Sequence, residues 1–326
     1  MYKPLFTITN EMLLRSMSIT EKLGRITSFQ SLKRMPTLRR NNKIKSIHSS
    51  LVIEANSLSL DQVRDVIAGK IVIGPQKEIQ EVKNAYKAYE MINEFDEYSE
   101  ADLLKAHGIL TYLTVDESGK YRNHGEGVFS GEQVIFVAPS QDLVPGLMNN
   151  LFNWLKNDNE TPMLLKSCLF HYEFVFIHPF IDGNGRTVRL WQSVLLTKWN
   201  PIFEYIPIET RIQKYQSEYY DKIAECHKNG NSDRFVEFML RLIDETLDEV
   251  IVNVSRETKN ISDQVNRLLD VMEPDIPLSA NEIMNRLGIK SKETLRARYL
   301  NPAIENGLIK MTLPDKPNSK NQRYVK

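Results

Sequence analysis

Apolar residues that recur every three or four positions predict a mostly helical chain. Near the middle, one stretch carries such a stripe: Leu165, Leu169, Tyr172 and Phe176. Thr161 and Pro162 stand just before it, where we expect an N-cap and a proline at the first helical position. A later stretch repeats the spacing: Phe235, Phe238, Met239 and Leu242. Both stretches should form helices that bury these side chains.

Two β-prone runs interrupt the helical pattern. They are Val128–Phe129 and Val134–Val137, and the four residues between them include a glycine. A short turn of this kind between β-prone runs predicts a β-hairpin.

The last fifty or so residues have the pattern of a separate unit. Pro274 and Pro277 break the preceding helical run, and Ser279–Glu282 is a capping box that opens a new helix. Ser291 caps a second helix, which we expect Asn301-Pro302 to interrupt, and the chain then ends as strand, turn and strand. This order resembles a winged helix-turn-helix. The expected fold class is therefore mostly α, with a helical core and a β-hairpin, plus a small α+β winged domain.

Composition narrows the class of protein. The 326 residues are 41% hydrophobic and 26% charged, with 42 basic and 42 acidic side chains, as in ordinary globular proteins. No apolar run approaches the ~20 residues of a membrane helix, and the first ten residues lack a signal-peptide core. Two cysteines, Cys168 and Cys226, make neither a disulfide framework nor a metal cluster. We expect a cytoplasmic protein with no membrane partner.

Candidate chemistry is concentrated in residues 178–189, His-Pro-Phe-Ile-Asp-Gly-Asn-Gly-Arg-Thr-Val-Arg. Gly183 and Gly185 flank Asn184, so the backbone can turn tightly and approach a ligand. No glycine or proline follows for ten residues, which predicts that the turn opens a helix. The free N–H groups and the dipole at such a start favour a phosphate. No Walker-type loop is present in the sequence.

Charged residues complete this site. Arg186 and Arg189 are three apart on one helix face, where guanidinium groups suit phosphate oxygens. Asp182 is an oxygen ligand suited to a Mg²⁺ that carries phosphates and waters. His178 titrates near neutrality and can take a proton from a hydroxyl. Together these residues predict phosphate-ester transfer from a magnesium nucleotide.

The run resembles the signature of the Fic (filamentation induced by cAMP) family, H-P-F-x-[DE]-G-N-G-R-x-x-R, at every fixed position. The resemblance implies a helical core that moves AMP from ATP onto a Ser, Thr or Tyr hydroxyl of a target protein. It makes His178 the base and Asp182 the Mg²⁺ ligand. The nucleotide-binding residues it implies are Gly183, Asn184, Gly185, Arg186 and Arg189.

Two further features take meaning from this resemblance. Related Doc-type kinases, which transfer the γ-phosphate, carry a lysine where this chain has Gly185, so AMP transfer is favoured. In Fic proteins a hairpin flap holds the target segment by strand addition, and the expected hairpin is either this flap or a small edge ribbon.

Ser50-Leu-Val-Ile-Glu54-Ala-Asn56 resembles the inhibitory motif [ST]-x-x-x-E-[GN] of Fic proteins in which an inhibitory helix precedes the core. Ser50 and Glu54 are four apart and share one helix face. The resemblance pairs this glutamate with Arg189 and so implies autoinhibition. Ala55 departs from the glycine or asparagine of the motif, so we expect the helix to end differently. The resemblance also implies a second possible use of this carboxylate, orienting a water for AMP removal, and the sequence does not separate the two uses.

We expect four parts: an N-terminal helical region (1–105) with the inhibitory motif, a Fic core (106–250), a linker helix (251–273) and the winged unit (274–326). From Arg286 to Lys326 there are ten Lys/Arg and three Asp/Glu, a net of +7 that suits phosphate backbones. DNA is one candidate partner of 274–326, through the basic residues Lys292, Arg296 and Arg298. Protein docking or a homodimer is the other. A DNA-binding regulator that only senses nucleotide is the alternative to an enzyme.

Overall fold

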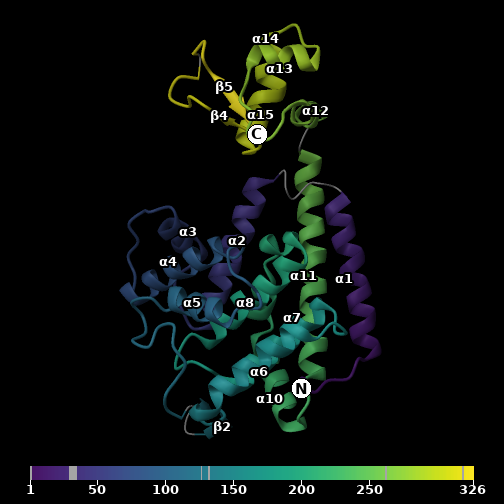
Figure 1. Cartoon of the computed structure of the whole chain (residues 1–326). Helices are drawn as coiled ribbons and strands as arrows, with labels where there is room; N and C mark the ends of the chain where they lie inside the picture. The colour runs from purple at the N-terminus through teal and green to yellow at the C-terminus, as the bar shows by residue number, and fades with distance from the viewer. Residues whose placement is uncertain (1, 29–34, 126, 131–132, 261–262, 318) are drawn as a thin grey trace. The chain divides into compact units, whose positions relative to one another are not determined.

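The computed structural model describes residues 2–28, 35–125, 127–130, 133–260, 263–317 and 319–326. The chain divides into two compact units, residues 1–23 with 42–248 and residues 24–41 with 249–326. Its α-helices are α1 (Asn10–Ser28), α2 (Pro36–Ile53), α3 (Leu60–Ile67), α4 (Gln76–Glu90), α5 (Glu100–Leu110), α6 (Val144–Asn157), α7 (Met163–Ile177), α8 (Asn184–Trp199), α9 (Ile208–Lys214), α10 (Gln216–Asn229), α11 (Asp233–Asn260), α12 (Asp263–Val271), α13 (Ala280–Leu287), α14 (Lys292–Leu295) and α15 (Asn301–Glu305) (Figure 1). The expected mostly helical class is confirmed.

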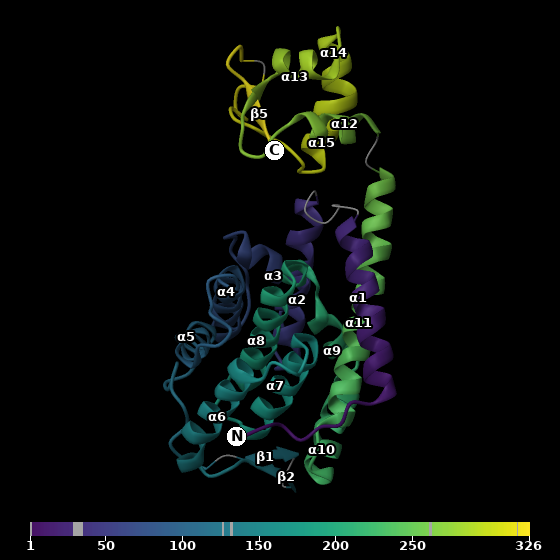
Figure 2. The ribbon, with the colours of Figure 1, turned by 45° about the vertical axis from the view of Figure 1, so that its right-hand side comes forward.

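Helices α7 and α8 form the centre of the first unit, where they pack against each other (Figure 2). Trp191 on α8 is fully buried, with the rings of Phe95 and Phe152 around it. A helix that is covered on nearly every side, as α8 is, must place its polar side chains against other buried groups. The stripe Phe235, Phe238, Met239 and Leu242 on α11 is buried, as its spacing predicts.

The start of α7 differs from the expectation by one residue. The helix begins at Met163, and Pro162 is its N-cap with an extended backbone, φ −57° and ψ 143°. Thr161 therefore does not cap the helix, because its hydroxyl donates instead to Asp158 at 2.6 Å. The threonine stabilises the turn before the helix.

The expected hairpin is present. Strand β1 (Gly127–Ser130) pairs antiparallel with β2 (Gln133–Val137), with Gly127 opposite Val137 and a bulge between Val128 and Phe129. Residues 131–132 of the expected turn lie outside the described residues.

The C-terminal residues form the expected winged fold. Strands β3 (Leu278–Ser279), β5 (Arg323–Val325) and β4 (Lys310–Met311) make an antiparallel sheet in that order. The capping box of Ser279 and Glu282 is formed, with both of its hydrogen bonds. A buried cluster ties the sheet to helices α12 to α15, with these members among others: Leu268, Leu269, Ile283, Leu295, Leu300 and Tyr324.

Asn301-Pro302 does not interrupt the second helix of this unit, contrary to expectation. Helical structure continues from Lys292 to Glu305, with a π-helical turn at Arg296–Leu300. The N–H of Asn301 bonds to the carbonyl of Arg296, five residues back. The wider turn accommodates a proline that has no N–H and whose ring would clash with a regular helix.

The expected boundaries after residues 105 and 250 fall inside α5 and α11. Part of the expected linker, 261–262, lies outside the described residues. The four-part division therefore stays a prediction. In the described ranges, no helix combines the length and apolar character that a membrane crossing needs.

Candidate active site

His178 ends α7 in an unusual backbone conformation. Its φ of 49° and ψ of 60° are left-handed, which costs a non-glycine residue of order 1–3 kcal/mol. Arg122 stabilises this conformation because its Nε donates to the carbonyl of His178 at 2.8 Å and its backbone N–H donates to the carbonyl of Pro179 at 2.9 Å. Backbone strain fixed by a buried arginine is typical of a functional position.

The imidazole of His178 is held in its neutral form near neutral pH. Burial lowers its pKa first, and the charge of Arg122 lowers it further; a backbone hydrogen bond at Val175 and the charge of Glu54 oppose the shift. A neutral imidazole can accept a proton, which is what the expected base must do.

The turn after His178 is closed by its own asparagine. Asn184 Oδ1 accepts from the N–H of Phe180 at 2.9 Å, and its Nδ2 donates to the carbonyl of Phe180 at 2.6 Å. Gly183 has φ 84°, and a β-carbon there would lie 2.8 Å from a methyl group of Thr111. Glycine is therefore required at 183 both by conformation and by space.

His107 on α5 supports the turn from behind. Its ring stacks on Phe180 with centroids 3.6 Å apart and planes 5° from parallel. Nδ1 accepts from the N–H of Gly119 at 2.9 Å, so Nε2 carries the proton and donates to the carbonyl of Asp182 at 2.9 Å. Burial lowers the pKa of His107 to about 4, which keeps this bond pattern intact at neutral pH.

Arg186 lies between two carboxylates. Its Nη2 bonds to Asp182 Oδ1 at 2.8 Å and its Nη1 to Glu81 Oε1 at 3.0 Å, and the Arg186 side chain is 5% exposed. The Nε of Arg186 is buried with no hydrogen-bond partner among the described residues. A buried guanidinium with an unmet donor suits an added anion such as a phosphate.

Asp182 fits the expected magnesium ligand. Its side chain is 42% exposed and so can reach a solvated ion. Within the described ranges no group of three or more His, Cys, Asp or Glu side chains could enclose a metal. Magnesium that arrives with phosphates and waters needs only one or two protein carboxylates, and Asp182 is a carboxylate of this kind.

Arg189 is buried and held by α2. Its Nε donates to Ser50 Oγ at 3.0 Å, and its Nη2 bonds to the Ser50 carbonyl at 2.8 Å and to Glu54 Oε1 at 2.7 Å. Its side chain is 1% exposed and that of Glu54 33%. Ser50 and Glu54 therefore lie on the helix face that their spacing predicts.

The carboxylate of Glu54 also lies against the start of α8. A β-carbon on Gly185 would overlap Glu54 Oε1 and would come within 2.9 Å of Arg189 Nη1. The first turn of a helix attracts anions. An internal carboxylate thus lies where the sequence predicts a phosphate.

Helix α2 ends in a left-handed turn at Ala55, a conformation that glycine or asparagine adopts more readily, so the alanine does not give the different helix end that we expected. Ala55 has φ 63°, and its N–H donates to the carbonyl of Val52 at 2.9 Å. The N–H of Asn56 donates to the carbonyl of Leu51 at 3.1 Å. This is a Schellman ending, which glycine or asparagine adopts with less strain. Alanine at residue 55 therefore raises the energetic cost of this turn and leaves its backbone conformation unchanged.

Comparison with known proteins fits this geometry. The family model "Fic/DOC family" matches residues 94–196, and the model "Filamentation induced by cAMP protein Fic-like, C-terminal domain" matches residues 263–325. A crystal structure of a Fic family protein from Desulfovibrio desulfuricans is 44% identical, with a TM-score of 0.75, over 99% of this chain and 98% of that one. The chain belongs to the Fic family.

Curated Fic relatives are more distant. Protein adenylyltransferase fic-1 of Caenorhabditis elegans is 25% identical over 80% of this chain and 54% of its own length. Protein adenylyltransferase Fic of Culex quinquefasciatus is 30% identical over 63% of this chain and 41% of its own length. The chain spans about half the length of the curated relatives it matches.

The predicted residues of the Fic signature lie along one turn and the first two turns of α8, and three residues that the sequence analysis did not assign to the site contact them. Glu81 contacts Arg186, His107 contacts Asp182, and Arg122 contacts His178. These partners come from α4, α5 and the segment before β1. They carry no local motif of their own.

Proposed function

We propose that the protein is an adenylyltransferase that moves AMP from Mg-ATP onto a Ser, Thr or Tyr hydroxyl of a target protein or of the chain itself. The observation that carries the proposal is the pairing of a neutral His178 with an anion site built by the start of α8, Arg186 and Arg189. Hydroxyl activation next to phosphate binding is what nucleotidyl transfer requires.

In the proposed reaction the target hydroxyl oxygen attacks the α-phosphorus of ATP. The hydroxyl proton passes to His178, the bond from the α-phosphorus to the bridging oxygen breaks, and pyrophosphate leaves. Arg186 binds on the β-phosphate side and Arg189 binds the γ-phosphate, while the backbone of residues 183–185 lines the cradle. Asp182 would hold a magnesium ion, which would neutralise phosphate charge.

We further propose that Glu54 keeps the enzyme largely inactive. The carboxylate binds Arg189 and also lies against the start of α8, so a γ-phosphate has to displace it. Ion pairs of this kind are strong where one partner is buried, and Arg189 is buried. Removal of AMP from a target, with Glu54 orienting the attacking water, is the second activity we propose for the same site.

Labelled nucleotide tests the proposal directly. We would incubate wild type, Glu54→Gly and Glu54→Gly/His178→Ala with α-labelled and γ-labelled ATP and magnesium, alone and in a cell lysate. We expect label from the α-phosphate only, more in Glu54→Gly than in wild type, and none without His178. Glu54→Gly/His124→Ala is the matched control, because His124 is exposed, and should label like Glu54→Gly.

Three outcomes would contradict the proposal. Label from the γ-phosphate alone would make the protein a kinase, and equal labelling by wild type and Glu54→Gly would remove autoinhibition. Absence of any covalent product, with nucleotide bound, would favour the sensor alternative.

For the winged unit we propose DNA binding. Lys292, Arg296 and Arg298 are all exposed on the second helix of the winged fold, where such folds present basic side chains to a phosphate backbone. We would titrate fluorescent duplex DNA with the full chain, with the Lys292→Glu/Arg296→Glu/Arg298→Glu variant, and with Lys77→Glu as an exposed control. The triple variant should lose binding and the control should keep it.

Lack of DNA binding by the intact chain at low salt would overturn this part of the proposal. Light scattering on the same samples would then test protein docking as a homodimer. We also propose a cytoplasmic location, since Cys168 and Cys226 are buried and free.

A further inference from the structure

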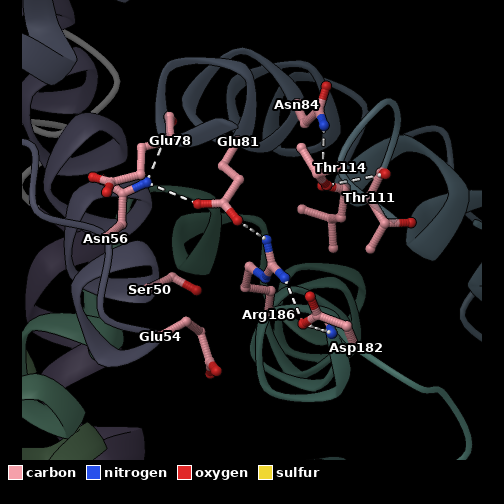
Figure 3. A network of polar contacts seen from close by, with 12 residues as sticks. Ser50, Glu54, Asn56, Glu78, Glu81, Asn84, Thr111, Thr114, Asp182 and Arg186 are labelled. Atoms are coloured by element: carbon pink, nitrogen blue, oxygen red, sulfur yellow. Dashed lines mark hydrogen bonds and ion pairs between the residues drawn. The ribbon is translucent and has the colours of Figure 1, made fainter. Parts of the chain in front are cut away.

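One carboxylate on α4 makes two contacts that belong to different parts of the site. Glu81 Oε1 bonds to Arg186 Nη1 at 3.0 Å, and Glu81 Oε2 accepts from Asn56 Nδ2 at 2.9 Å (Figure 3). The Glu81 side chain is 12% exposed, so both bonds are shielded from water. Shielded charge-assisted bonds are about twice as strong as neutral ones.

Asn56 belongs to the segment that follows the Glu54 helix. It is 5% exposed, and besides Glu81 it donates to the carbonyl of Glu78 at 3.3 Å and accepts from the N–H of Leu58 at 3.2 Å. Only Ala55 separates Asn56 from Glu54 in the chain, and the left-handed turn at Ala55 joins them. The position of Asn56 therefore helps to set the position of Glu54.

Glu78 holds the same segment without reaching the nucleotide site. Its Oε2 accepts from the N–H and the hydroxyl of Ser57, at 2.6 and 2.7 Å. The segment after α2 is thus attached to α4 at two points, of which only Glu81 also contacts a signature arginine.

On the other side, Arg186 is one of the two arginines of the anion site. A phosphate that binds Arg186 competes with Glu81 for guanidinium N–H groups and repels its negative charge. Any ligand that weakens the Glu81–Arg186 pair therefore also disturbs the carboxylate that anchors Asn56.

We infer that Glu81 is a positioning residue that couples nucleotide binding at Arg186 to release of the segment carrying Glu54. This inference rests on the proposed function and adds a regulatory route to it. A phosphate on Arg186 loosens the Glu81–Asn56 contact, and release of Asn56 lets Glu54 leave Arg189. Thermodynamic linkage makes the coupling reciprocal, so a variant that loses the Asn56–Glu81 contact should bind nucleotide more tightly.

The test is a double-mutant cycle between Asn56 and Glu81, read as the affinity for α,β-methylene-ATP with magnesium by calorimetry. Asn56→Ala should tighten binding about fivefold, the lower end of typical allosteric couplings, although it leaves Arg186 and Asp182 untouched. In a Glu81→Gln background the same change should alter the affinity less than about twofold. Ser57→Ala, which loses only a bond to Glu78, is the matched control and should also stay within about twofold.

A second measurement follows the segment itself. Hydrogen exchange of the amides at residues 55–58 should speed up when the analogue is added to wild type. In Glu81→Gln exchange should already be fast and should not respond to the analogue. If Glu81 only supported the structure, Glu81→Gln would change the exchange rate of these amides, but the rate would still respond to nucleotide.

The outcomes separate this inference from the proposed function. Equal tightening by Asn56→Ala in both backgrounds, or no tightening in either, overturns the coupling even where Glu54→Gly transfers α-label. Coupling without any transfer by Glu54→Gly overturns the proposed activity and leaves the coupling standing. Failure of the analogue to bind any variant, Glu54→Gly included, overturns both.

Discussion

The carboxylate of Glu54 lies against Gly185, in the space that a β-carbon on residue 185 would fill. The signature glycine and the glutamate from α2 thus fit each other in this closed arrangement. A side chain at 185 and a docked Glu54 exclude one another.

Gly185→Ala should destabilise the wild-type protein by about 1–3 kcal/mol, because the added methyl displaces Glu54 from Arg189. In a Glu54→Gly background the carboxylate is gone and only Arg189 Nη1, 2.9 Å from the added carbon, has to shift. Alanine also favours helix over glycine by about 1 kcal/mol, so the substitution should destabilise this background less than it destabilises wild type. Urea unfolding of the four proteins measures the difference, and equal effects in both backgrounds would contradict it.

Ala55→Gly should stabilise the protein by about 1 kcal/mol, because glycine adopts the left-handed turn without the strain that a β-carbon brings. Ala68→Gly is the matched control. Ala68 ends α3 at φ −78°, so glycine there gains nothing and lowers the unfolding free energy. A shift of the urea midpoint in the same direction for both variants would refute the argument.

The rate of AMP transfer by Glu54→Gly should hold through mildly acidic pH. His178 must be neutral to accept a proton, and burial lowers its pKa from 6.5, so the acid limb of the rate profile lies below 6.5. Glu54 raises this pKa, so its removal moves the limb further toward acid. Profiles of kcat/KM against pH for wild type and Glu54→Gly test both points; a limb at or above 6.5 in Glu54→Gly would be inconsistent with them.

His107 should make stability depend on pH in a definite direction. Its pKa is about 4 when folded and 6.5 otherwise, so the unfolded chain binds the extra proton between these values. The stabilisation is complete above pH 6.5 and is lost as pH falls toward 4, by about 3 kcal/mol in all. The gap in unfolding free energy between wild type and His107→Asn should therefore narrow by that amount between pH 7 and pH 4. A constant gap would refute the assignment.

Much of the site could be predicted because its chemistry is local in sequence. Residues 178–189 form one turn and the start of one helix, so spacing alone brings Asp182 and Arg186 into contact and places His178 just before the turn. Ser50 and Glu54 were predicted because residues 50–56 resemble the inhibitory motif, and their spacing of four then placed both on one helix face. Their partner Arg189 lies 135 positions from Glu54, and only the resemblance to Fic proteins linked the two.

Other parts could not be predicted from local patterns. Glu81 lies 105 residues from Arg186, His107 lies 75 from Asp182, and Arg122 lies 56 from His178. His107 and Arg122 bind backbone carbonyls, which every residue carries, so no pattern of side chains marks them. The predicted interruption at Asn301-Pro302 was wrong because a π turn can accommodate a proline, and the occurrence of such a turn depends on tertiary packing.

Asn184 and Gly185 form an Asn-Gly pair, the dipeptide whose amide is lost most readily in a free chain, since the glycine N–H can turn back on the side chain. Here the amide is 6% exposed and bonded to Phe180 through both of its atoms, and the N–H of residue 185 lies in the first turn of α8. Deamidation would replace the donor with a negative oxygen inside a phosphate cradle. Folding thus protects Asn184 from deamidation, and each unfolding event exposes the Asn184 amide to this slow, irreversible reaction.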